Sequence, residues 1–134
     1  MIFQDLTPDF FYWKVKHGRA AFSNFLRNTF TEDNVLVAVA EKMGKGLVGF
    51  TLAQIEFLPE WFGSEQIGII RYQAVSKNYQ GKGVGHEMTD FVMDWFRSLG
   101  ISRIELNVLN VLPASKYWSK IGFKEFMDRR FIEL

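Results

Sequence analysis

The sequence predicts a single α/β domain over residues 1–134, with a mixed central sheet flanked by helices. Short apolar runs rich in β-branched residues alternate along the chain with segments whose apolar residues recur at helical spacing. The expected order is two helices, three strands, a helix, a strand, a helix and two strands. The strand, helix and strand in the middle of this order require a parallel, right-handed crossover. A chain of 134 residues also has the usual size of one domain.

The N-terminal half is expected to contain two helices and a β-hairpin. Thr7 and Pro8 are typical of a helix start, and this first helix is expected to end near residue 16. Apolar residues at helical spacing over 21–30 predict the second helix. Two apolar runs, 35–40 and 47–53, are separated by a turn and predict an antiparallel hairpin.

The C-terminal half is expected to carry the crossover. Residues 67–75 are predicted to form the third strand, and the helical periodicity over 84–99 predicts a long amphipathic helix. Polar and apolar residues alternate over 103–109, as they do in a strand, and residues 113–120 are predicted to form a short helix. Two short final strands are expected within residues 122–134.

The composition excludes several classes of function. Cysteine is absent, which rules out disulfides, thiolate metal sites and a cysteine nucleophile, and two separated histidines predict no metal site. The 16 basic residues nearly balance the 15 acidic ones, so we expect neither a nucleic-acid nor a membrane partner. No apolar run approaches the roughly 18 residues of a membrane span, and no signal peptide is evident, so a cytoplasmic location is expected.

The chemistry is expected at the turn that follows the third strand. Gly81, Gly83 and Gly85 occupy every second position there, with Lys82 between the first two. Such glycines let backbone N–H groups approach an anion at the start of a helix. A dinucleotide fingerprint would need glycine where His86 stands, and a nucleoside-triphosphate loop would need Ser or Thr directly after Lys82. Neither of these motifs is therefore present.

The pattern Gln80-x-x-Gly83-x-Gly85 resembles the pyrophosphate-binding motif of the GCN5-related N-acetyltransferase (GNAT) superfamily, which reads Gln or Arg, two residues, Gly, one residue, then Gly or Ala. A second stretch, Ala114 to Phe123, is similar to the pattern Ala-x-x-Phe-Tyr-x-Lys-x-Gly-Phe in the same family. The two motifs also lie the right distance apart. The resemblance implies the GNAT-like fold and covers residues 67–123 well.

The resemblance implies an acetyl-CoA-dependent N-acetyltransferase that passes an acetyl group directly to a primary amine of a small molecule or protein. A backbone N–H near the end of the third strand would polarise the thioester carbonyl. The alternative is a non-catalytic CoA-binding module with a sensory or regulatory role. The implied cofactor contacts are Ala74, Val75, Gln80, Gly81, Lys82, Gly83, Val84 and Gly85, with Asn110 near the usual cofactor-binding Asn of the family.

The N-terminal end departs from the family, which normally opens with a strand. Only residues 2–5 are available here, so this edge strand is expected to be short or missing. A homodimer is one possible assembly. The acceptor amine is expected to approach from the loop 58–64 and the N-terminal helices. Trp61 and Phe62 are candidates for lining that approach.

The proton donor is a second departure. The family often uses the Tyr of its Phe-Tyr pair, but Trp118 stands at that position and Tyr117 at the Phe position. A phenol can donate a proton usefully and an indole N–H cannot. Neighbouring helical residues point roughly 100° apart, so Tyr117 is the catalytic candidate only if the helix is rotated, and otherwise water completes the transfer. The base stays open among Glu56, Glu60, Tyr72, Glu105 and a water chain.

Overall fold

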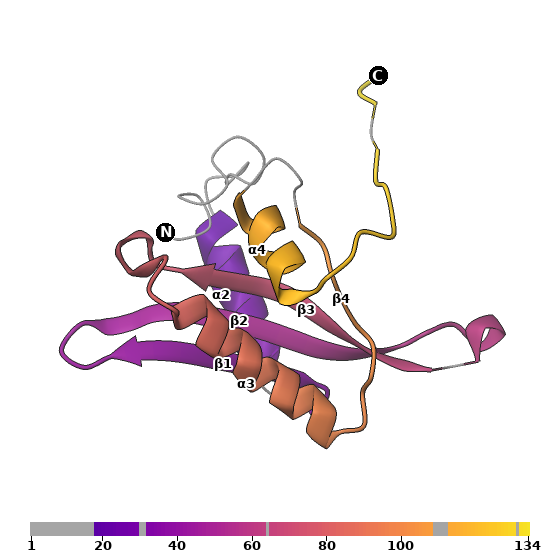
Figure 1. Cartoon of the computed structure of the whole chain (residues 1–134), viewed down its shortest axis with the longest axis horizontal. Coiled ribbons are helices and arrows are strands. Elements are labelled where there is room, and N and C mark those ends of the chain that lie inside the picture. The colour runs from indigo at the N-terminus through magenta and orange to yellow at the C-terminus, as the bar shows by residue number, and fades with distance from the viewer. Residues whose placement is uncertain (1–17, 30–31, 64, 109–112, 131) are drawn as a thin grey trace.

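The computed structural model describes residues 18–29, 32–63, 65–108, 113–130 and 132–134 (Figure 1). Their regular elements are α2 (Gly18–Thr29), β1 (Val35–Lys42), β2 (Gly46–Phe57), β3 (Gln66–Val75), α3 (Val84–Ser98), β4 (Ile104–Leu106) and α4 (Pro113–Ile121). Two short 3-10 helices, η1 (Glu60–Phe62) and η2 (Lys77–Tyr79), precede and follow β3. The first expected helix and the N-terminal edge strand lie outside the described residues.

The four described strands form one mixed sheet in the order β1-β2-β3-β4. β1 pairs with β2 and β2 with β3 in antiparallel fashion, whereas β3 and β4 are parallel. The predicted hairpin and the predicted parallel crossover are therefore confirmed. α3 and α4 cover one face of this sheet, and α2 lies on the other (Figure 1).

The core lies between the sheet and the α3–α4 layer. Its buried members are Ala53, Ile70, Val92, Phe96, Ile101 and Trp118. Phe96 is fully buried, and full burial of a side chain of this kind contributes about 1.5–3 kcal/mol. Gly68 makes room for it, because a Cβ at this position of β3 would lie 2.6 Å from the Phe96 ring. The close packing of α3 on the sheet therefore depends on a glycine in the middle of a strand.

β3 contains a bulge at Arg71. Ala53 of β2 faces Ile70 and Leu52 faces Tyr72, so Arg71 is left over in the register. A bulge breaks the alternation of side chains along a strand. As a consequence two successive residues, Arg71 and Tyr72, both line a pocket on the α2 face of the sheet.

Two predictions about the C-terminal part are wrong. Over the described residues up to 108, the fourth strand comprises Ile104–Leu106 and not the whole expected stretch from 103, because its ladder with β3 covers only Gly68 to Ile70. No strand forms within 122–130 or 132–134, where most residues are exposed. A strand needs a neighbouring edge that takes up its backbone hydrogen bonds, and the described end of the chain runs away from the sheet (Figure 1).

Candidate functional site

β3 extends beyond the point at which β4 leaves it. The parallel ladder ends where Ile70 faces Leu106, whereas β3 continues to Val75. Over Tyr72–Val75, no strand among the described residues pairs with the side of β3 that faces away from β2. Open strand edges of this kind bind extended ligands through main-chain hydrogen bonds. The predicted cofactor contacts Ala74 and Val75 lie on this open edge.

The glycine turn follows β3 and leads into α3. Gly81 has φ +74° and Gly83 has φ +89°, a backbone conformation that residues other than glycine rarely adopt. A Cβ added to either would meet no atom within 4 Å, so the requirement comes from the backbone and not from packing. Gly83 is the N-cap of α3, and no side chain caps this helix start. The first N–H groups of α3, from Val84 onward, therefore suit an anion.

The side chains of the turn have different roles. Gln80 Nε2 donates a hydrogen bond of 3.0 Å to the Val75 carbonyl oxygen, so this side chain ties the turn to the end of β3. The Lys82 Nζ atom lies 5.6 Å from the centre of the Tyr79 ring, and the Lys42 Nζ atom lies 5.1 Å from the same centre. Lys42 is not part of any local motif, because only the hairpin of β1 and β2 brings it to the turn.

A hydrogen-bond network joins three elements beside the glycine turn. Tyr117 Oη on α4 lies 2.9 Å from Thr89 Oγ1 on α3. Thr89 Oγ1 also donates to the Gly85 carbonyl oxygen at 2.8 Å and accepts from Gln73 Nε2 of β3 at 3.0 Å. Gln73 Nε2 further donates to the Gly85 carbonyl oxygen at 3.2 Å. The predicted proton donor is thus held at the turn by residues of β3 and α3.

One hydrogen-bond acceptor beside this network, Gln73 Oε1, has no partner among the described residues. The Gly85 carbonyl oxygen can only accept, which requires the NH₂ group of Gln73 to face it. Gln73 Oε1 is then buried and finds no hydrogen-bond partner among the described residues. An unsatisfied buried acceptor costs about 1–3 kcal/mol. A ligand that brings an N–H donor to this position would remove that cost.

Within the described part of the chain, Trp118 takes no part in the hydrogen bonds of this network, although its ring packs edge to face on the Tyr117 ring, with 4.9 Å between the ring centres. It is 8% exposed and belongs to the core with Val92 and Phe96. Its ring packs edge to face on Phe123, with 5.4 Å between the ring centres. Of the two neighbouring aromatic residues, Tyr117 therefore reaches the glycine turn and Trp118 is a core residue.

The remaining candidates are spread over the molecule. Asn110 lies outside the described residues. Glu56 pairs with Arg71, and Glu105 pairs with Arg103. The aromatic residues of η1 are exposed, Trp61 at 81% and Phe62 at 66%, and neither they nor the neighbouring Glu60 line the pocket on the α2 face.

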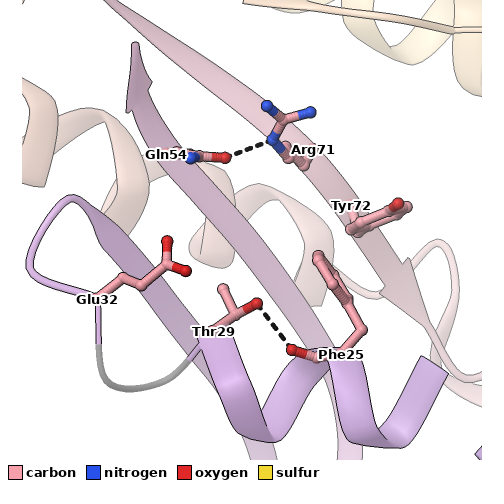
Figure 2. A pocket seen from close by; sticks show the side chains of 6 residues that line it. All are labelled: Phe25, Thr29, Glu32, Gln54, Arg71 and Tyr72. Carbon is pink, nitrogen blue, oxygen red and sulfur yellow. Dashed lines mark hydrogen bonds between the residues drawn. The ribbon is translucent and has the colours of Figure 1, made fainter. Parts of the chain in front are cut away.

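That pocket has a volume of about 300 Å³ and lies beside the bulge of β3 (Figure 2). Its lining comprises Phe25, Thr29, Glu32, Gln54, Arg71 and Tyr72. Tyr72 was a candidate base from sequence. The other five were missed, because they come from α2, the loop after it, β2 and β3, and no local motif links them.

The site combines three features of one α/β sheet: an open strand edge, a glycine turn at a helix start, and a tyrosine held beside that turn. Such an arrangement suits an extended anionic ligand at the carboxyl end of a strand. The chain belongs to the acetyltransferase (GNAT) family, whose model matches residues 1–123. The predicted family and its fold are confirmed.

Solved structures share this fold at low sequence identity. An acetyl transferase from Pyrococcus furiosus superposes with a TM-score of 0.79 at 17% identity, over 98% of this chain and 88% of the other. An aminoglycoside antibiotic 6′-N-acetyltransferase from Acinetobacter haemolyticus gives 0.74 at 15% identity, over 98% and 89%. A transcriptional regulator from Bacillus halodurans C-125 gives 0.73 at 15% identity, over 90% and 87%. None of the curated proteins matches the chain significantly.

Two further properties concern the part of the chain that the structure describes. None of its helices combines the length and the apolar character that crossing a bilayer requires. Its His, Asp and Glu side chains form no group of three that could hold a metal ion.

Proposed function

We propose that the protein is an N-acetyltransferase that uses acetyl-CoA and passes the acetyl group directly to a primary amine of a small molecule or protein. The observation that carries this proposal is the Tyr117 hydroxyl, held 2.9 Å from Thr89 beside the glycine turn. This contact supports a shared site for the proposed proton donor and the proposed anion cradle. Membership of the GNAT family supports acetyl transfer in general, and the donor and the nitrogen acceptor are the proposed part.

The described residues fit coenzyme A. The backbone of residues 81–85 and the ammonium of Lys82 suit a pyrophosphate. The open edge of β3 over Tyr72–Val75 suits an arm that carries amide groups, and the unpaired Gln73 Oε1 would accept from an amide N–H. When bound, acetyl-CoA supplies an activated acetyl group on a sulfur that must gain a proton as it leaves.

The side chains and backbone of the protein supply the rest of the chemistry. Backbone N–H groups at the open edge near Val75 are the proposed donors to a developing oxyanion. Tyr117 Oη is the proposed proton donor. Since the chain has no cysteine, an acyl-cysteine route is excluded, which supports the proposed direct attack of the amine.

Thr89 is the proposed positioning residue for Tyr117. Its hydroxyl carries one proton but has two acceptors within reach, the Gly85 carbonyl oxygen at 2.8 Å and Tyr117 Oη at 2.9 Å. While Tyr117 keeps its proton, that proton can point to Thr89 Oγ1. When Tyr117 gives the proton away, the Thr89 hydroxyl can turn and donate to the phenolate oxygen. This rotation would stabilise both states of Tyr117.

A second candidate function is a CoA-binding module without turnover. The observation that favours it is Trp118, which occupies the usual Tyr position of the family and is buried in the core. Both candidates predict binding of CoA, and only the enzyme predicts release of free thiol in the presence of an amine.

The deciding experiment is a calorimetric titration of the protein with acetyl-CoA, followed by a thiol-release assay over a panel of primary amines. We expect binding in the micromolar range and amine-dependent release. Binding without release for every amine would favour the regulatory module. Absence of binding would reject both candidates.

A further inference from the structure

The pocket on the α2 face lies at a particular point of β3. The ladder with β4 ends at Ile70, the bulge falls on Arg71, and Tyr72 is the first residue of the open edge. Arg71 and Tyr72 both line the pocket (Figure 2), whereas Gln73, the next residue, faces α3 and the Tyr117 network. A molecule in the pocket therefore reaches the open edge from the face opposite to Tyr117.

Two charged side chains, Arg71 and Glu32, line the pocket among the described residues. Arg71 Nε donates to Gln54 Oε1 at 2.5 Å, and its guanidinium forms an ion pair with the Glu56 carboxylate. The positive charge of Arg71 is thus neutralised within the sheet. The Glu32 carboxylate, by contrast, has neither an ion pair nor a hydrogen bond within the described residues. Figure 2 shows its side chain among those that line the pocket, on the loop that follows α2. Within the part of the chain that the structure describes, one uncompensated negative charge remains at this pocket.

The rest of the lining suits an alkyl chain that carries a positive charge. Phe25 and Tyr72 pack edge to face, with 6.3 Å between their ring centres, and aromatic rings attract cations as well as methylene groups. Thr29 Oγ1 already donates to the Phe25 carbonyl oxygen at 2.7 Å. A volume of about 300 Å³ is at the lower end for ligand pockets, which fits a short aliphatic chain better than an oligosaccharide.

We propose that this pocket binds a second basic group of the acceptor, so that the acceptor class is a short aliphatic diamine. The proposal rests on the proposed N-acetyltransferase function. An amine that attacks a carbonyl has to be uncharged, so the ammonium that meets the Glu32 carboxylate is not the nitrogen that reacts. Glu32 is then a specificity-determining residue, and the rings of Phe25 and Tyr72 flank the carbon chain.

The kinetic test compares three acceptors of similar length: 1,5-diaminopentane, 5-aminopentan-1-ol and pentylamine. Only the first carries a second charge. We expect it to have the highest kcat/KM, and we expect Glu32→Gln to raise its KM about fivefold while the values for pentylamine stay unchanged. Glu125→Gln is the matched control, because Glu125 is an exposed glutamate near the end of the chain and lies outside the pocket lining.

A binding test separates this proposal from the acetyltransferase itself. Saturation-transfer NMR with 1,5-diaminopentane alone should give a signal with the wild type and with Glu125→Gln, and a weak one or none with Glu32→Gln. If amines are acetylated but Glu32→Gln alters neither the KM nor this signal, the diamine proposal is overturned and the enzyme remains. If the signal depends on Glu32 but no amine releases thiol, the pocket remains and the acetyltransferase is rejected.

Discussion

The hydroxyl of Tyr117 lies 2.9 Å from Thr89 Oγ1, and this contact joins α4 to the first turns of α3. Thr89 is 1% exposed, so the contact is made in a largely water-free part of the molecule. The neighbouring residue Trp118 is buried in the core, where its ring packs on both Tyr117 and Phe123.

Replacement of Tyr117 by Phe tests the proposed proton donor. The change removes the hydroxyl and keeps the ring, so we expect kcat to fall about a hundredfold while the Kd of acetyl-CoA changes little. Steady-state thiol release and calorimetric titration measure the two quantities. Undiminished turnover of Tyr117→Phe would assign proton transfer to water, as the sequence reading left open.

Replacement of Thr89 tests the positioning role. Thr89→Val keeps the shape of the side chain but leaves Gln73 Nε2 and Tyr117 Oη without their shared partner, so we expect the free energy of unfolding to fall by about 1–3 kcal/mol. We also expect a lower kcat at unchanged Kd for acetyl-CoA. Thr89→Ser keeps the hydroxyl and should recover most of the turnover, as judged by the same thiol-release assay. A role in packing alone predicts the opposite order, with Val better than Ser.

The glycine turn allows a test of the cofactor cradle with a matched control. Gly83 and Gly44 both have positive φ, +89° and +77°, and a Cβ at either would meet no atom within 4 Å. Alanine at each position should therefore lower the free energy of unfolding by a similar amount, roughly 1–2 kcal/mol, through backbone strain. Chemical denaturation measures this quantity. Only Gly83→Ala should weaken the binding of acetyl-CoA, measured by calorimetric titration, because Gly44 lies in the hairpin turn between β1 and β2. Equal affinities of the two variants would contradict the cradle.

Local periodicity explains how much of the fold was predictable. The described helices repeat their apolar residues at helical spacing, and the hairpin strands are short apolar runs on either side of a turn, so short windows of sequence sufficed to place α3, β1 and β2. The two final strands were wrongly predicted, because apolar residues near the end of the chain were read as strands without a neighbouring edge that could pair with them. The same limit explains β4, whose length depends on where β3 diverges from it.

The candidate site was predictable only where a motif is contiguous. The glycine turn and Tyr117 lie in two short stretches, and both stretches were found from sequence. The bulge at Arg71 leaves no mark in the apolar pattern, although it decides which face Arg71 and Tyr72 share. Glu32 was missed for a related reason, because its pocket is assembled from α2, β2 and β3. The choice between Tyr117 and Trp118 depends on the rotation of α4, which tertiary packing sets.

The packing of α3 on the sheet gives a prediction about stability that is independent of catalysis. A Cβ at Gly68 would lie 2.6 Å from the ring of Phe96, which is fully buried and has no room to move aside. We expect Gly68→Ala to lower the free energy of unfolding by about 1–3 kcal/mol, measured by urea denaturation. Gly85→Ala is the control: its Cβ would meet Val75 and other neighbours only at 3.6 Å or more, and alanine favours a helix by up to about 1 kcal/mol. Equal stability of Gly68→Ala and the wild type would mean that α3 can shift on the sheet without loss.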